Sequence, residues 1–129
     1  MNRFLVIMIP LLCLVFMGCR KNTAGSGGKA SISGYVEYQG NRVYRNTVVF
    51  IKYGASSFPG TDVSQYDSQQ NVDAQGNYNF ATMFIGSYYL YARGNYIDAN
   101  GFILNLTGGI QVNITDKKQN LNYDIAVHP

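Results

Sequence analysis

Few residues of this 129-residue chain have side chains suited to covalent or acid–base chemistry. The chain contains two cysteines, Cys13 and Cys19, and one histidine, His128. No cysteine follows Arg20, so the body of the chain has no disulfide framework, thiolate zinc site or cysteine nucleophile. His128 is next to the last residue, where chain ends tend to fray, whereas a triad or a zinc site needs a rigidly held histidine. We therefore expect no catalytic residue, no metal and no cofactor.

The acidic residues lack the spacing of a catalytic or calcium-binding motif. Asp98 and Asp116 lie in turn-like sequences, where a carboxylate accepts hydrogen bonds from its own backbone. Asp62 and Asp67 share one polar loop, but calcium takes six or more oxygen ligands and its motif is absent. A pair of acids brought together only by the fold, as in glycosidases, stays open as a small-hydrolase alternative.

Cys19 lies at the boundary between an apolar and a charged segment. Arg3 precedes an uncharged run from Phe4 to Met17. This run matches the apolar core of a secretory signal and is shorter than the roughly 20 residues that span a bilayer. Gly18 is the small residue that a signal peptidase requires before its cut. A cut after Gly18 would make Cys19 the first residue of the mature chain.

This boundary resembles the lipobox of bacterial lipoproteins, in which the cysteine sulfur is acylated. The resemblance implies that Cys19 carries acyl chains such as palmitate and tethers the protein to a membrane. Phe16 and Met17 depart from the usual lipobox, so a signal peptide cut elsewhere and an uncleaved anchor stay open. Arg20 stands where Asp would indicate retention in the inner membrane. We expect the bacterial outer membrane, on its periplasmic face, with the cell surface as the alternative.

The chain divides into three segments. Residues 1–18 are the expected lipoprotein signal peptide, and residues 19–29 are an expected lipidated flexible linker, rich in Gly and basic residues. Residues 30–129 are long enough for one ordinary domain. Ten Lys and Arg against seven Asp and Glu are scattered along the chain, which argues against a nucleic-acid groove.

Composition and alternation predict a domain made of strands. The chain has eleven Tyr, seven Phe and fourteen Gly, and aromatic and β-branched residues favour pleated, half-buried surfaces. Alternating apolar residues predict strands over 30–38, 46–53, 66–73, 78–83, 87–93, 110–114 and 121–127. Residues 102–106 are either an exposed apolar tip or an extra strand. The expected fold class is all-β: an immunoglobulin-like, transthyretin-like antiparallel β-sandwich of about seven strands.

Four short motifs in residues 30–127 resemble those of the carboxypeptidase regulatory-like domain, a transthyretin-like β-sandwich. They are Ile32-x-Gly34-x-Val36, Thr47-x-Val49-x-Ile51, Asp73-x-x-Gly76-x-Tyr78-x-Phe80, and Gly86-x-Tyr88-x-Leu90-x-Ala92 with Gly94. Residues 43–47 depart from the family pattern, which often has Pro-Leu and Gly-Ala before the second strand. The resemblance implies a non-catalytic domain that supports folding, docking or adhesion, and it supplies no active site.

Aromatic residues that alternation places away from the core are the candidate contacts. Tyr35, Tyr89 and Tyr91 could line one sheet face that stacks on a sugar or takes a protein partner. The alternative is aromatic cross-strand packing, or cover by the apolar segment 102–106. Phe102, just after a turn, is a fourth candidate contact.

Together these features predict a non-enzymatic, membrane-tethered lipoprotein that acts as an envelope scaffold or protein-interaction module. Its expected partners are a membrane, through the lipid on Cys19, and an envelope protein or glycan, but no nucleic acid. A glycan-binding accessory lipoprotein that uses exposed tyrosines is the first alternative, and a small hydrolase is the second.

Overall fold

The computed structural model describes residues 24–129. The expected signal peptide over 1–18, the acylation site Cys19 and the first part of the expected linker lie outside the described residues. Within residues 24–129 no helix is long and apolar enough to cross a membrane.

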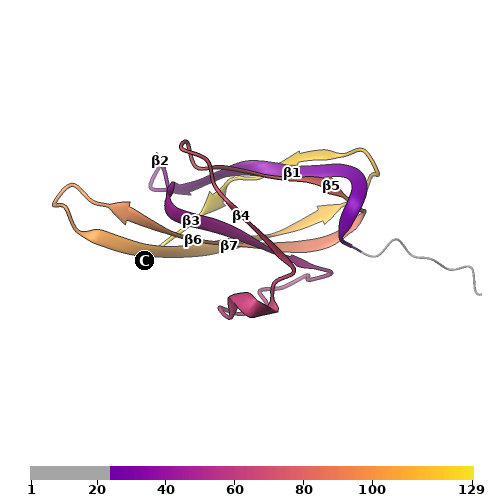
Figure 1. Cartoon of the computed structure of the whole chain (residues 1–129), viewed down its shortest axis with the longest axis horizontal. Coiled ribbons are helices and arrows are strands. Elements are labelled where there is room, and N and C mark those ends of the chain that lie inside the picture. The colour runs from indigo at the N-terminus through magenta and orange to yellow at the C-terminus, as the bar shows by residue number, and fades with distance from the viewer. Residues whose placement is uncertain (1–23) are drawn as a thin grey trace, which may run out of the picture.

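The described chain folds into two sheets packed face to face (Figure 1). One sheet has the order β4-β3-β6-β7, and in the other β1 lies between β2 and β5 and also pairs with β8 and β9. The strands are β1 (Ser26–Tyr38), β2 (Asn41–Arg42), β3 (Arg45–Tyr53), β4 (Ser68–Asn71), β5 (Asn77–Met83), β6 (Gly86–Ile97), β7 (Ile103–Ile114), β8 (Asn120–Asn122) and β9 (Ile125–Ala126). The helix in these residues is a single 3₁₀ turn, η1 (Val63–Gln65). The expected β-sandwich is therefore confirmed.

Inward-pointing residues of both sheets form one core. Alternation along β1, β5 and β6 places Ile32, Tyr78 and Leu90 inside, as the sequence predicts. The core also contains a Thr47 side chain, whose hydroxyl donates to the Arg45 carbonyl oxygen at 2.9 Å. The hydrogen bond offsets the cost of burying that hydroxyl.

The last part of the chain departs from the single strand expected over 121–127. It is divided into β8 and β9, and both run parallel to β1, whereas the other pairings are antiparallel. Between them the chain passes over Gly34, where a β-carbon would collide with the carbonyl oxygen of Tyr123. Glycine at this position lets the two backbones approach, which is why the ladder is interrupted there.

The boundary of the expected linker over 19–29 is wrong at its C-terminal end, because β1 already begins at Ser26. Ser26 and Ala30 both pair with Met83, across a bulge in β1. A β-carbon at Gly28 would collide with the Met83 carbonyl oxygen. The glycines that suggested flexibility instead permit close packing of β1 against the end of β5.

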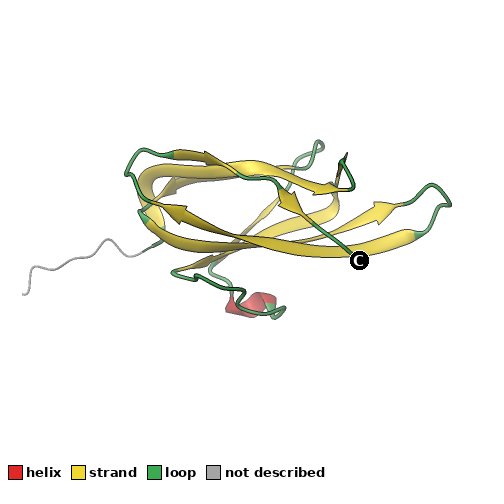
Figure 2. Ribbon diagram, turned by 180° about the vertical axis from the view of Figure 1, so that it is seen from behind, coloured by secondary structure: helices red, strands yellow, loops and turns green. Residues whose placement is uncertain are grey.

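The long β6–β7 hairpin extends beyond the other strands of the sandwich (Figure 2). Asp98 makes its turn, since its carboxylate accepts from the N–H groups of Asn100 and Phe102, both at 2.9 Å. Gly101 adopts a φ of 84° in this turn, which favours glycine. The alternatives for residues 102–106 are resolved: Phe102 lies at the tip and β7 begins at Ile103.

The C-terminal end does not fray, contrary to our expectation for His128. Its N–H donates to the Thr107 carbonyl at 2.8 Å, and the Thr107 N–H donates to the His128 carbonyl at 2.9 Å. Because β9 pairs with β1 and His128 pairs with β7, the chain end joins the two sheets along one side.

Tyr88 connects the start of the described chain to the sandwich, which gives the first prediction. Its buried hydroxyl accepts from the Gly25 N–H at 2.8 Å and donates to the Phe84 carbonyl at 2.7 Å. Tyr88→Phe leaves both groups without this partner, so we expect a loss of about 1–3 kcal/mol in the free energy of unfolding. Urea denaturation at neutral pH measures it.

Tyr89→Phe is the matched control, because the Tyr89 hydroxyl bonds to no described residue and points to the opposite face. We expect that change to stay within about 0.5 kcal/mol. Equal stabilities of the two variants would contradict the role assigned to the Tyr88 hydroxyl.

Candidate functional site

The outer face of the β3, β6 and β7 strands carries rows of side chains set by strand pairing. Val48, Arg93 and Thr107 form one row. Phe50 and Tyr91 form the next, ending at Gly109. Every second residue of a strand points to the same face. Each row therefore joins residues that are far apart in the sequence.

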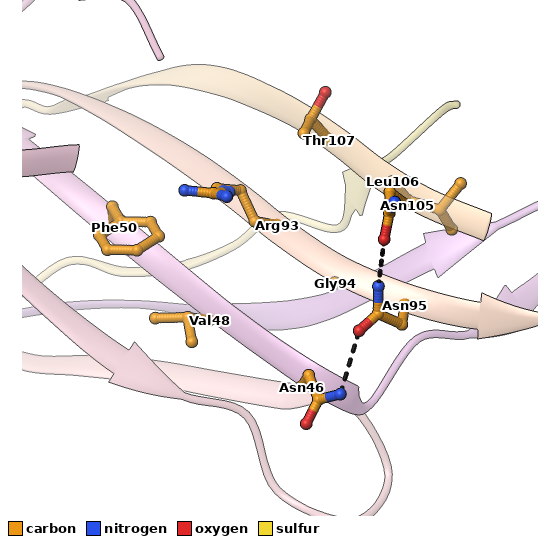
Figure 3. Close-up of a pocket in the computed structure, with 9 residues that line it drawn as sticks. All are labelled: Asn46, Val48, Phe50, Arg93, Gly94, Asn95, Asn105, Leu106 and Thr107. Carbon is orange, nitrogen blue, oxygen red and sulfur yellow. Dashed lines mark hydrogen bonds between the residues drawn. The ribbon is translucent and has the colours of Figure 1, made fainter. Parts of the chain in front are cut away.

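A groove of about 570 Å³ crosses these rows on the outer face (Figure 3). Its size falls within the range of roughly 300–1,000 Å³ typical of ligand sites. Val48 and Phe50 supply apolar surface, and the remaining lining is polar apart from Gly94 and Leu106. The lining residues are Asn46, Val48, Phe50, Arg93, Gly94, Asn95, Asn105, Leu106 and Thr107.

Three asparagine amides form a ladder across one end of the groove. The Asn46 Nδ2 donates to Asn95 Oδ1 at 3.0 Å, and the Asn95 Nδ2 donates to Asn105 Oδ1 at 2.7 Å (Figure 3). These bonds fix which way each amide faces. The ladder leaves the Asn46 Oδ1 as an acceptor and the Asn105 Nδ2 as a donor, each without a hydrogen bond to another described residue.

Arg93 is the charged residue of the groove lining. Its exposed guanidinium forms no ion pair and no side-chain hydrogen bond within residues 24–129. The lining contains no Asp or Glu. Five N–H donors in a planar fork are therefore available to a ligand at this position.

An aromatic cluster covers the neighbouring part of the same face and shares Phe50 with the groove lining. It consists of Phe50, Phe58, Tyr66, Tyr89 and Tyr91. Tyr66 stacks on Tyr91 with ring centroids 5.7 Å apart, and Phe58 lies 5.6 Å from Tyr89 and 5.4 Å from Tyr91. Phe58 and Tyr66 belong to the segment after β3 that contains η1, which lies outside this sheet in both ribbon views (Figures 1 and 2).

This cluster corrects two expectations. Tyr91 is only 4% exposed, so it is not an open contact residue, and Tyr89 is half-buried. The segment that covers them is 54–67, not 102–106. The alternative of aromatic packing is the arrangement observed, because rings gain more from mutual contact than from exposure to water.

Tyr35 does not join Tyr89 and Tyr91, because it lies on β1 in the other sheet. The guanidinium carbon of Arg42 lies 3.3 Å from the centroid of its ring. Asp124 raises the pKa of Tyr35 through hydrogen bonding and charge. Arg42 thus covers one side of the Tyr35 ring. The expectation that Tyr35, Tyr89 and Tyr91 line one sheet face is wrong, because β1 and β6 belong to different sheets.

Phe102 lies at the tip of the β6–β7 hairpin, 66% exposed beside Ile103 at 67%. Ile97, which pairs with Ile103, is also exposed. Phe102 is therefore the predicted contact residue that the structure leaves open, although it lies outside the groove lining.

The acids of the described chain mainly build turns. Asp62, Asp73, Asp98 and Asp116 each accept a backbone N–H from two residues further on. The bonds from the Ser64 hydroxyl and the Ser64 N–H lower the pKa of Asp62, and the N–H bonds from Asn77 and Gln75 lower the pKa of Asp73. Within residues 24–129 no three His, Cys, Asp or Glu side chains gather in a metal-binding group.

The groove residues were not predicted from the sequence. Alternation in β6 implied that Arg93 and Asn95 point outward, as Tyr89 and Tyr91 do. Their neighbours Asn46 and Asn105 come from other strands, and no local pattern marks them. Alternation within one strand indicates which side chains point outward, but it does not indicate which strands become neighbours.

Comparisons with known proteins bear on the fold. No protein family matches the sequence, and no curated protein matches it. Among solved structures, the chain is similar to the major pilin subunit of Bacillus cereus, with a TM-score of 0.58 and 13% identity. The match covers 79% of this chain and 30% of the pilin subunit, so the chain spans under a third of that protein.

A second similar structure comes from Pseudomonas aeruginosa and is provisionally described as a carbohydrate binding protein. It has a TM-score of 0.58 and 14% identity, and the match covers 80% of this chain and 91% of that chain. Both likenesses agree with the sandwich architecture. The resemblance to the carboxypeptidase regulatory-like domain stays an expectation.

Tyr66 supplies the second prediction, on pH dependence. Burial, with the nearby Tyr91 and Tyr89, raises the pKa of Tyr66 to about 12, whereas a free tyrosine titrates near about 10. The folded state keeps the neutral phenol, so this contribution to stability is complete below about pH 10 and is lost as pH rises toward 12. We expect Tyr66→Phe to lose less stability than the wild type between pH 9 and 11, measured by urea denaturation at about these values.

The Tyr66 hydroxyl also donates to the Gly60 carbonyl at 2.9 Å. Loss of that bond lowers the free energy of unfolding of Tyr66→Phe at every pH at which the wild-type phenol is neutral. The two proteins are therefore compared by how much each free energy of unfolding changes with pH, and not by their absolute values. Identical declines in the two proteins would rule out the buried Tyr66 as a source of alkaline instability.

Proposed function

We propose that this chain is a non-enzymatic binding module of the bacterial envelope whose groove on the β3–β6–β7 face takes a glycan. The observation that carries the proposal is the amide ladder of Asn46, Asn95 and Asn105 beside Arg93, whose guanidinium has no ion-pair partner among residues 24–129. Oriented amides and guanidinium donors match the paired hydroxyls of a sugar ring. Val48, which is only partly buried, offers apolar surface to its C–H face.

Two further points support a glycan ligand. The groove runs across three strands on an open sheet face, and such a site accommodates an extended chain. A similar structure is provisionally described as carbohydrate binding, and what that protein binds is extended to this chain only as part of the proposal. The carboxylates of the turn residues are occupied with backbone bonds, which is consistent with binding without catalysis.

The second candidate is the scaffold function expected from the sequence. Phe102, Ile103 and Ile97 favour it, because exposed large apolar side chains gathered at one tip are typical of protein contact sites. This site is separate from the groove lining, so the two candidate functions respond to different substitutions.

Arg93→Ala is the third prediction. Loss of a charged donor to a ligand costs about 1.5–3 kcal/mol, which corresponds to a decrease in glycan affinity of roughly tenfold or more. Asn95→Ala should weaken binding as well, because it removes the central rung of the ladder. Glycan-array screening of the wild type, followed by calorimetry with the best ligand, measures both effects.

Asn113→Ala is the matched control, an exposed β7 residue outside the groove lining. We expect its affinity to equal that of the wild type. If wild-type protein binds no glycan on the array, the groove proposal fails and the hairpin tip becomes the leading site.

The anchor gives the fourth prediction. We propose that the signal peptide over 1–18 is removed and that acylated Cys19 tethers the module to the outer membrane, on its periplasmic face. The intact mass of protein extracted from membranes should equal residues 19–129 plus acyl chains. Cys19→Ala should abolish the added mass and release the protein from the membrane fraction. A wild-type mass without lipid would contradict the anchor.

A further inference from the structure

A basic pocket lies at the end of the sandwich where β1 begins. Its volume is about 330 Å³. Lys29 comes from β1, while Lys117 and Lys118 come from the turn between β7 and β8. Phe84, between β5 and β6, lies against the same space and is 37% exposed. The lining combines three lysines with apolar surface and contains no Asp or Glu.

A glycine lies against Phe84 in this pocket, and a turn acid lies next to its lysines in the sequence. A β-carbon at Gly27 would lie 3.0 Å from the Phe84 ring, so the aromatic side chain packs directly on the backbone of β1. Asp116 is the nearest acid along the lysine turn, and its carboxylate accepts from the Lys118 N–H at 2.9 Å. That carboxylate is directed toward the turn backbone.

The position of the pocket links it to the membrane side of the molecule. The Phe84 N–H donates to the Gly25 carbonyl at 2.8 Å, and Ala24, the first described residue, packs against Gly86. Cys19 precedes Ala24 by five residues, which span at most about 18 Å when fully extended. A membrane that holds an acyl chain on Cys19 therefore lies within about that distance of the pocket.

We propose that Lys29, Lys117, Lys118 and Phe84 form a seat for the phosphate headgroups of an anionic lipid bilayer. The lysine ammonium groups neutralise the phosphates, and each basic residue near such a surface contributes about 1 kcal/mol. The partly exposed Phe84 ring supplies the apolar contact that Phe and Trp side chains make at a membrane interface. The sequence places Arg20 and Lys21 between the anchor and this seat. The nearness of this seat to the membrane rests on the proposed acyl anchor, whereas the binding of phosphates by its lysines does not.

This seat would orient the whole domain. The β6–β7 turn lies at the opposite end of the sandwich from the start of β1 (Figure 1). Twelve residues of β6 extend over about 40 Å at roughly 3.3 Å each. With the lysine end on the lipid, the groove and the hairpin tip face away from the membrane and stay open to ligands.

Vesicle binding by a chain without the lipid tests the seat independently of the anchor. Residues 19–129 carrying Cys19→Ser retain every buried core residue of the described structure, from Ala30 to Val127. We expect this protein to sediment with phosphatidylcholine vesicles that contain phosphatidylglycerol, but not with phosphatidylcholine alone, and to be released by salt. Lys117→Gln combined with Lys118→Gln should weaken binding by about 30-fold, or roughly fivefold per lysine.

Arg42→Gln combined with Arg45→Gln removes the same net charge from exposed residues beyond the other end of β1. Unchanged binding by this control supports a local seat, whereas equal losses in both double variants would overturn it. Equal binding to both vesicle types, or full release by inorganic phosphate at the concentration of the lipid phosphate, would also overturn it. The intact mass of the membrane-extracted protein decides separately whether Cys19 carries an acyl anchor.

Discussion

Twelve residue pairs in unbroken register link β6 to β7 along their full length. This pairing joins Gly86 with Ile114 at one end and Ile97 with Ile103 at the other. A shift of one residue would exchange the two faces of a strand. The same pairing that turns Leu90 inward therefore turns Arg93 outward, so the core and the groove are two results of one register.

Strand β1 holds the other sheet together by pairing along both of its sides. Its partners are β2, β5, β8 and β9, and the last two pair in parallel because the chain end returns along β1. The Tyr88 hydroxyl ties the start of this strand to the opposite sheet. Backbone bonds between His128 and Thr107 close the side where β9 ends. Both ends of the described chain are thus joined to the fold.

The surface chemistry of the domain is separated along its length and between its faces. Lysines and Phe84 gather where β1 begins, whereas Phe102 and Ile103 lie at the far tip. The oriented amides and Arg93 lie on one outer sheet face. This division is compatible with the proposed anchor and the proposed groove, because it puts the lysine end and the groove on different parts of the surface. The Asp side chains contribute mainly to turn geometry, as Asp98 does in the hairpin.

The β-sandwich, the inward stripes of residues such as Ile32 and Leu90, and the turns at Asp98 and Asp116 could all be predicted from the sequence. These features depend on alternation and on bonds between near neighbours, which a linear pattern records. Three features appear only in the folded chain: Tyr35 lies on the other sheet, the segment containing Tyr66 covers Tyr91, and three asparagines meet in one ladder. Those outcomes depend on which strands become neighbours and where loops fold back. Strand order and loop packing arise from long-range contacts that local periodicity does not encode.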